Sequence, residues 1–330
     1  MNHNKMSHKE RIMAALGKLE TDYSPCIVNY HNLSKVVRGN RKVNFPWGEN
    51  ASVQEQIRYS VDELGISQIV DFSIPIRRMH KDVKWKTWKE NNLLYKQYET
   101  PAGSVRAVVE FDRYWTHGDD IPLSTDWTAN FKEPWIENEQ DLECIKYLFI
   151  PWEPDHTEYM NLKESYKKTK DFAEQYGLPI AAYAGGGLTI GLQMFFPEKL
   201  CFKTLENPEL VHGFLEMEHK CNLRTIEIAG DLGIDIIKRN GFYESSDFYS
   251  PHMLEDFLGR RLTEEINKTH QYDMKMIYTL HTGIMPMLDY LNHLDIDCIF
   301  GIDIAFPGVS LEKIKEKLFH NKALFTGPSS

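Results

Sequence analysis

The sequence predicts an α/β protein of the (β/α)8 TIM-type barrel class, folded as a single domain over residues 1–330. Short, almost continuously apolar runs alternate with helical patterns, as expected for parallel strands that are covered by helices. Two predicted helices open with a capping residue followed by proline, at Asn207-Pro208 and Ser250-Pro251. A chain of 330 residues that is 42% hydrophobic can also bury one large core.

The amino-terminal elements follow this alternation. Ser7 and Glu10 have the spacing of a capping box, which predicts a short helix that stops at Gly17. Apolar, β-branched runs at residues 25–29 and 68–71 predict the first two strands, and residues 53–64 have helical periodicity. A β-α-β alternation therefore begins here.

Residues 83–135 interrupt the alternation. From Val83 to Val109, aromatic and charged residues alternate around Pro101-Ala-Gly103, which predicts a β-hairpin inserted into the barrel. The stretch from Phe111 to Trp135 is aromatic, rich in aspartate and has little period of its own. We interpret it as a long functional loop or lid, because structureless segments of this length inside a domain are usually functional.

Regular alternation resumes after Asp155. Helices are predicted over residues 162–176 and 208–228, from Ser250 onward and after Ser310. Strands are predicted at residues 179–183, 234–238, 276–280, 298–300 and 323–325. With the first two, these make seven strands, whereas the barrel needs eight. Either the last β/α unit follows Ser330 or the barrel is incomplete.

Composition excludes several classes of function. A net charge of -10 and a pI near 5.7 leave no basic surface for a nucleic-acid backbone. The longest apolar runs are far shorter than the roughly 20 residues that span a bilayer, and the polar amino terminus lacks the core of a signal peptide. Five scattered cysteines indicate reduced thiols. We expect a cytoplasmic protein without nucleic-acid or membrane partners.

Polar side chains follow most of the predicted strands. In a parallel barrel the active site lies at the carboxyl ends of the strands, so these residues are the first candidates. Polar loops also follow strands in any α/β protein, and each residue taken alone has that simpler explanation. We expect catalytic roles for His281, Glu244, Asp303 and Tyr183, and substrate binding by Asn29, His31, Asp71, Lys238, Arg239 and Asn240.

Three of these positions suggest particular chemistry. His281 follows a strand and precedes Gly283, which places an imidazole where it could bind metal or shuttle a proton, or instead bond a loop carbonyl. Glu244 could ligate metal or act as acid or base, although exposed glutamates are commoner. Lys238 and Arg239 are adjacent, so only one of them can face the inside of the barrel.

Known short motifs are few. Gly185-Gly-Gly187 lets a backbone approach a ligand closely but fits neither the dinucleotide fingerprint nor the phosphate loop, so a turn without cofactor is the better interpretation. The sequence has no G-x-S-x-G elbow and no H-E-x-x-H pair, which disfavours hydrolases and zinc proteases.

Several segments, taken in order, resemble the uroporphyrinogen decarboxylase superfamily. The resemblance extends from the first helix to the last residue and rests on segments 10–16 (ERIMAAL), 23–25 (YSP), 99–106 (ETPAGSVR), 233–235 (GID), 250–251 (SP), 280–283 (LHTG) and 323–330 (ALFTGPSS). The superfamily contains cofactor-free decarboxylases and methyltransferases that work with a corrinoid. The Thr-Pro-Ala-Gly segment and the histidine-glycine strand end resemble the methyltransferase branch.

The decarboxylase branch resembles the chain less closely. Those enzymes hold substrate carboxylates with an arginine-rich segment after the first strand, and this chain has Val28-Asn-Tyr-His-Asn-Leu33 there. The resemblance therefore implies methyl transfer from a small methylated substrate, of the methoxylated aromatic or methylamine type, to a corrinoid carried by a partner protein. A uroporphyrinogen decarboxylase of tetrapyrrole biosynthesis and a non-catalytic barrel subunit are the alternatives.

Family methyltransferases often hold zinc through a His-x-Cys pair and a later cysteine. The zinc acts there as a Lewis acid that activates the methyl donor or acceptor. Here Leu280-His-Thr-Gly283 has no cysteine, and a later one would lie beyond Ser330. The resemblance leaves zinc held by His281 and Glu244 as the expected metal site.

Overall fold

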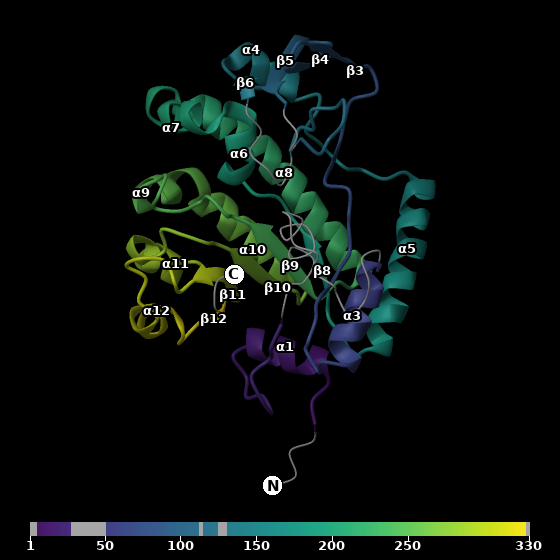
Figure 1. Ribbon diagram of the computed structural model, residues 1–330, viewed down its shortest axis with the longest axis vertical. Coiled ribbons are helices and arrows are strands. Elements are labelled where there is room, and N and C mark those ends of the chain that lie inside the picture. The colour runs from purple at the N-terminus through teal and green to yellow at the C-terminus, as the bar shows by residue number, and fades with distance from the viewer. Residues whose placement is uncertain (1–4, 28–50, 112–114, 125–130, 328–330) are drawn as a thin grey trace.

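The computed structural model of the protein describes residues 5–27, 51–111, 115–124 and 131–327. A curled parallel sheet forms its centre (Figure 1), with strands in the order β1-β8-β9-β10-β11-β12. All neighbouring strands pair in parallel. The strands are β1 (Val70–Asp71), β8 (Ile180–Tyr183), β9 (Ile236–Asn240), β10 (Lys275–Thr279), β11 (Cys298–Asp303) and β12 (Ala323–Gly327).

This sheet confirms the predicted α/β class and the predicted alternation. Six of the seven predicted strands are present, with boundaries shifted by one to three residues. The first predicted strand is described only as far as Ile27, which forms a parallel bridge with Ser67 beside β1. The described strands form a curled, barrel-like sheet of six strands. A closed barrel of eight strands stays a prediction.

Helix α1 (His8–Leu16) covers the amino-terminal end of the inner face of the sheet. It begins with the predicted capping box, in which Ser7 accepts from the Glu10 N–H and Glu10 accepts from the Ser7 N–H. Ile12 and Leu16 of this helix pack with Ala181, Ile236 and other inner-face residues of the strands in a cluster of their own. In Figure 1, α1 lies at the bottom of the molecule, below the strands.

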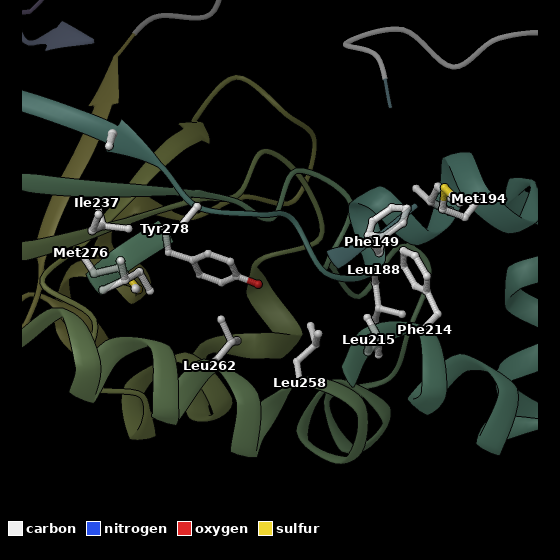
Figure 2. Close-up of a cluster of buried hydrophobic side chains, with 14 of the residues drawn as sticks. Phe149, Leu188, Met194, Phe214, Leu215, Ile237, Leu258, Leu262, Met276 and Tyr278 are labelled. Carbon is white, nitrogen blue, oxygen red and sulfur yellow. The ribbon is translucent and has the colours of Figure 1, made fainter. Parts of the chain in front are cut away.

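The outer face of the sheet packs against helices. Because side chains alternate along a strand, Ile237 of β9 and Met276 and Tyr278 of β10 share this face. They face Leu258 and Leu262 (Figure 2). The long helix α8 (Pro208–Leu232) lies beside α10 (Arg260–Gln271), and α5 (His156–Gln175) lies along another side of the molecule (Figure 1).

The remaining helices connect these layers. The helix predicted from Ser250 begins as α9 (Pro251–Leu254) and continues into α10 through one π-helical turn, Glu255–Gly259. The others are α3 (Val53–Asp62), α4 (Glu139–Ile145), α6 (Leu188–Phe195), α7 (Pro197–Glu206), a 3-10 turn (Met285–Met287), α11 (Leu288–His293) and α12 (Leu311–Leu318). In the described part of the chain, no helix has the length and apolar character needed to cross a membrane.

The predicted hairpin is part of a larger antiparallel sheet, which lies at the top of Figure 1. Its strands are β3 (Lys84–Glu90), β4 (Leu93–Thr100), β5 (Gly103–Glu110) and β6 (Phe131–Glu133), and a separate short pair joins β2 (Arg77–Arg78) to β7 (Ile150–Pro151). The predicted turn joins β4 to β5. A second turn, at Asn91 with φ 55°, joins β3 to β4 and has no glycine or proline to signal it.

The segment interpreted as a lid is partly core. Ile121, Phe131 and Trp135 are buried, and Phe131 pairs with Val109 of β5. Trp115 is half-buried and donates to the Gly118 carbonyl at 3.0 Å. Tyr114 and Trp127 lie outside the described residues. Phe131 and the ion pair between Asp120 and Lys96 thus tie described parts of this segment to the antiparallel sheet, and its role as a lid stays a prediction.

Candidate functional site

Three polar side chains meet on the inner face at the carboxyl ends of β1, β8 and β9. The ammonium of Lys238 is bonded to Asp71, and the Tyr183 hydroxyl donates to the same carboxylate at 3.3 Å. The Lys238 nitrogen also lies 5.3 Å from the centre of the Tyr183 ring. Asp71 and Tyr183 are exposed and Lys238 is partly exposed, so a ligand can reach this cluster. We call Asp71, Tyr183 and Lys238 the inner cluster.

His281 lies just beyond the end of β10. Its ring stacks on Phe242 with 4.8 Å between centroids and an angle of 16°. Partial burial of the ring lowers the pKa of His281, and the charge of Asp303 opposes this only in part. The imidazole is therefore neutral at pH 7, the form that can accept a proton or bind a metal. Its side chain still reaches solvent.

A second polar group, larger and fully buried, lies on the outer face between the sheet and helices α8 and α10. Arg239 donates to Glu244 at 2.6 Å and to Glu265 at 2.8 Å. The Tyr278 hydroxyl donates to Glu244 as well. Each of these side chains is at most 1% exposed. We call Arg239, Glu244, Glu265, Glu218, His219, Asn222 and Tyr278 the outer network.

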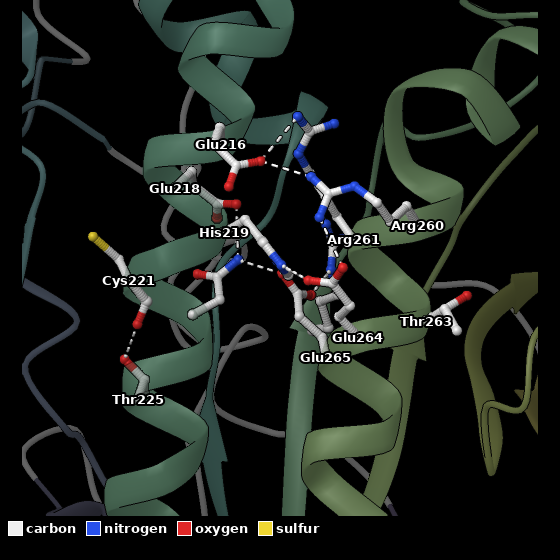
Figure 3. A network of polar contacts seen from close by, with 12 residues as sticks. Glu216, Glu218, His219, Cys221, Thr225, Arg260, Arg261, Thr263, Glu264 and Glu265 are labelled. Atoms are coloured by element: carbon white, nitrogen blue, oxygen red, sulfur yellow. Dashed lines mark hydrogen bonds and ion pairs between the residues drawn. The ribbon is translucent and has the colours of Figure 1, made fainter.

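The outer network continues along α8 (Figure 3). Glu218 accepts from the side chain of Asn222 at 2.8 Å, and Asn222 also donates to Glu265 at 3.0 Å. His219 lies between Glu265 and Glu264, at 3.0 and 2.8 Å from its two ring nitrogens. Three fully buried carboxylates thus share two cationic side chains.

Burial and charge determine the protonation of this network. Burial raises the pKa of Glu218, as does the charge of Glu265. Burial alone would lower the pKa of His219, but its bonds to Glu265 and Glu264 outweigh burial and raise it. Burial likewise opposes the charge on Arg239, yet the surrounding carboxylates raise its pKa well above its usual value. The surrounding carboxylates therefore favour the charged forms of Arg239 and His219, whereas burial favours the protonated forms of Glu218 and Glu244.

The outer network holds the backbone of the triglycine turn that follows β8. Glu218 accepts from the Gly186 N–H at 2.8 Å, and Glu244 accepts from the Leu188 N–H, at the start of α6, at 2.9 Å. Helix α6 has no side-chain cap of its own, so the Glu244 carboxylate takes that place. Gly187 has φ 48°, and a Cβ there would overlap Glu244 and Arg239. The absence of side chains at Gly185 and Gly187 therefore leaves room for Glu218, Glu244 and Arg239.

These positions correct part of the sequence prediction. Lys238 and Arg239 do face opposite sides, and Lys238 is the one on the inner face. Arg239, predicted to bind substrate, is instead buried among carboxylates on the outer face. Glu244, predicted to act beside His281, contacts Arg239, Tyr278 and the Leu188 N–H. Both residues went to the helix-covered side, where their charges neutralise each other.

The other predicted residues divide into two groups. Asp71, Tyr183, Lys238, Asn240, His281 and Asp303 all lie at or just beyond the carboxyl ends of the parallel strands. Hydrogen bonds join the first three. Asn240 is half-buried, and its N–H donates to the Gly185 carbonyl at 3.2 Å. Asn29 and His31 lie outside the described residues.

The predicted zinc site is not supported by the arrangement of side chains. The described parts of the chain contain no group of three His, Cys, Asp or Glu side chains placed to hold a metal ion. Glu244 is already bonded to a guanidinium, a hydroxyl and an amide, so it is unavailable as a partner of His281.

Sequence reasoning missed Glu218, His219, Asn222 and Glu265. A signal was present, because Glu218 and Asn222 recur at i, i+4 on the same buried stripe of α8 as Leu215 and Ile226. Polar residues on an apolar stripe indicate a buried polar network when a second helix offers complementary charges. The pairing of α8 with α10, which supplies Glu265, could not be read from either helix alone.

Comparison with known proteins supports the fold. No family model matches the chain, and no curated protein sequence matches it. Solved structures do match, among them a methyltransferase from Methanosarcina mazei. The two chains share a fold. Their TM-score is 0.57 at 14% sequence identity, over 97% of this chain and 82% of the other. At this identity the likeness extends to the fold and no further.

Proposed function

We propose that this chain is a methyltransferase of the uroporphyrinogen decarboxylase superfamily, built on a TIM-type (β/α) barrel. It would pass a methyl group from a small methylated substrate to a corrinoid carried by a partner protein. The observation that carries the proposal is the inner cluster at the ends of β1, β8 and β9, with His281 just beyond the neighbouring strand β10, in a sheet whose fold is shared with a methyltransferase. The sequence segments that resemble the superfamily add to it.

The charges at the strand ends favour this reading over decarboxylation of a tetrapyrrole. A substrate with many carboxylates needs several available cations. Lys238 is bonded to Asp71, and Arg239 is bonded to Glu244 and Glu265. Both cations already have carboxylate counter-charges, so they do not form the set of several unneutralised cations that a tetrapyrrole with many carboxylates requires.

The inner cluster has the groups that removal of a methyl group requires. A corrinoid bound at this end of the sheet would supply a reduced cobalt as the nucleophile for the methyl group. In a methoxylated aromatic donor, the bond between methyl carbon and oxygen breaks, and the electron pair stays on the oxygen. The Tyr183 hydroxyl or the Lys238 ammonium then gives that oxygen a proton, while Asp71 holds both donors in place. His281, being neutral, accepts a hydrogen bond that orients the substrate.

The test is methylation of cob(I)alamin by the purified protein. Methoxylated aromatics and methylamines are offered in turn, and methylcobalamin is followed by its absorbance. We expect one donor class to react, with Tyr183→Phe and His281→Ala each about 100-fold slower, the usual scale for losing an acid or base group. The surface variant Tyr272→Phe is the control. Coproporphyrinogen formation from uroporphyrinogen, with no methylcobalamin from any donor, would overturn the proposal in favour of the decarboxylase.

A further inference from the structure

Arg77 occupies an unusual position near the carboxyl end of the sheet. It lies in β2, six residues after Asp71 at the end of β1, and pairs with Pro151 of β7. Its guanidinium lies 4.3 Å from the centre of the Phe149 ring, and one terminal nitrogen donates to the Ser124 hydroxyl at 3.0 Å. Part of the Arg77 residue reaches the surface, while its guanidinium is largely buried.

Among the described arginines that are buried or partly buried, Arg77 is the one without an acidic partner. The other five each have a carboxylate oxygen at 3.3 Å or closer, namely Arg11, Arg78, Arg224, Arg239 and Arg261. The neighbouring Arg78, in the same short strand, is bonded to Glu158 at 3.0 Å. Arg77 has only the neutral hydroxyl of Ser124 and the face of an aromatic ring.

This environment leaves the charge of Arg77 incompletely balanced. Burial lowers the pKa of Arg77, and Cys221, Glu218 and Tyr98 oppose this only in part. Glu218 already accepts hydrogen bonds from Asn222 and Gly186. A cation that is taken out of water without a partner is costly, and proteins tolerate one mainly where a ligand supplies the counter-charge.

We propose that Arg77 and Ser124 form a binding site for the carboxylate of a small ligand. A guanidinium offers paired N–H donors in one plane, which match the two oxygens of a carboxylate. Phe149 covers one face of that plane and so fixes its orientation. Ser124 adds a hydroxyl that can donate to the same anion. This inference rests on the proposed function: if the chain is a methyltransferase, its methyl donor is a methoxylated aromatic acid rather than a methylamine.

The first experiment measures binding without any corrinoid. Isothermal titration compares 4-methoxybenzoate with anisole, which lacks the carboxylate. We expect the parent protein to bind the benzoate about 10- to 100-fold more tightly, the range for hydrogen bonds to a charged group. Arg77→Met should abolish that preference, Arg77→Lys should retain part of it, and the neighbouring Arg78→Met should keep it. Equal affinity of the parent for both ligands, or a preference that survives in Arg77→Met, would overturn the site.

A second arm distinguishes the source of the anion. Inorganic phosphate is titrated into the same four proteins. If phosphate binds more tightly than 4-methoxybenzoate and needs Arg77, the carboxylate assignment is overturned. Weak phosphate binding beside tight benzoate binding supports it.

Thermal melting of the ligand-free protein separates binding from a structural role. Removal of an unpaired buried cation should leave the midpoint of Arg77→Met unchanged or higher, because methionine fills similar space without a charge. A midpoint lowered by several degrees would make Arg77 a structural residue and overturn the proposal. Because these measurements need no methyl transfer, loss of methylation with intact Arg77-dependent binding would count against the proposed function alone.

Discussion

Two adjacent residues of β9 show how differently the two faces of the sheet use charge. Lys238, on the inner face, is bonded to an exposed aspartate and remains within reach of solvent. Arg239, on the outer face, is 1% exposed and bonded to two fully buried glutamates. The outer network is enclosed, so its task is to hold the protein together. The inner cluster is open, so its groups remain available for chemistry.

The largest expected effect breaks the outer network at its centre. Arg239→Met leaves Glu244 and Glu265 buried without their cation, which should lower the free energy of unfolding by about 3–5 kcal/mol. Lys238→Met should cost no more than about 1 kcal/mol, because its partner Asp71 is exposed. Urea denaturation at pH 7 measures both. Similar losses in the two variants would refute the contrast between the faces.

A smaller effect is expected where the outer network meets the triglycine turn. Gly187→Ala forces a side chain into a left-handed backbone region, at about 1–3 kcal/mol, and adds an overlap with Glu244 and Arg239. Gly65→Ala is the matched control, because Gly65 also has positive φ (63°) but nothing within 4 Å of an added Cβ. The excess cost of Gly187→Ala in unfolding experiments measures the packing. Equal costs would mean that the turn can move away from the network.

The smallest expected effect is a dependence of stability on pH. The folded chain raises the pKa of His219 and of Glu218, so both bind protons more tightly when folded. The stability from His219 is therefore fully present below about pH 6.5, its unfolded pKa, and is lost as the pH rises through the folded pKa. The contribution of Glu218 to stability has the same sign: it is fully present below its unfolded pKa, near pH 4.3, and is lost as the pH rises above that value.

Denaturation from pH 5 to 9 tests this dependence. His219→Gln should flatten the decline above pH 6.5, whereas His252→Gln, at an exposed position in α9, should leave the parent curve unchanged. A His219→Gln variant whose stability falls above pH 6.5 as steeply as that of the parent would contradict the raised pKa of His219.

More of the fold than of the candidate site could be predicted from the sequence. Strands such as β10 and helices such as α8 carry their period and caps in neighbouring residues, so local pattern was enough to place them. The strand ends also identified Asp71, Tyr183 and Lys238 as candidates. The sequence did not indicate the direction of Arg239 and Glu244, because that direction depends on helix α10, which supplies Glu265 from far along the chain. The turn at Asn91 was not predicted, because this asparagine has a positive φ, a backbone conformation that glycine adopts more often.

Helix α1 has a consequence for the order of events during turnover. Its residues Ile12 and Leu16 pack against Ala181 and Ile236 and so cover one end of the curled sheet. On the proposed function, the donor then reaches the inner cluster from the carboxyl ends of the strands. A corrinoid protein that delivers its cofactor there would cover the carboxyl ends of the strands and prevent the donor from entering. On the proposed function, the small donor must enter first and its demethylated product must leave last, so kinetics should follow a compulsory sequence in which excess partner slows the reaction.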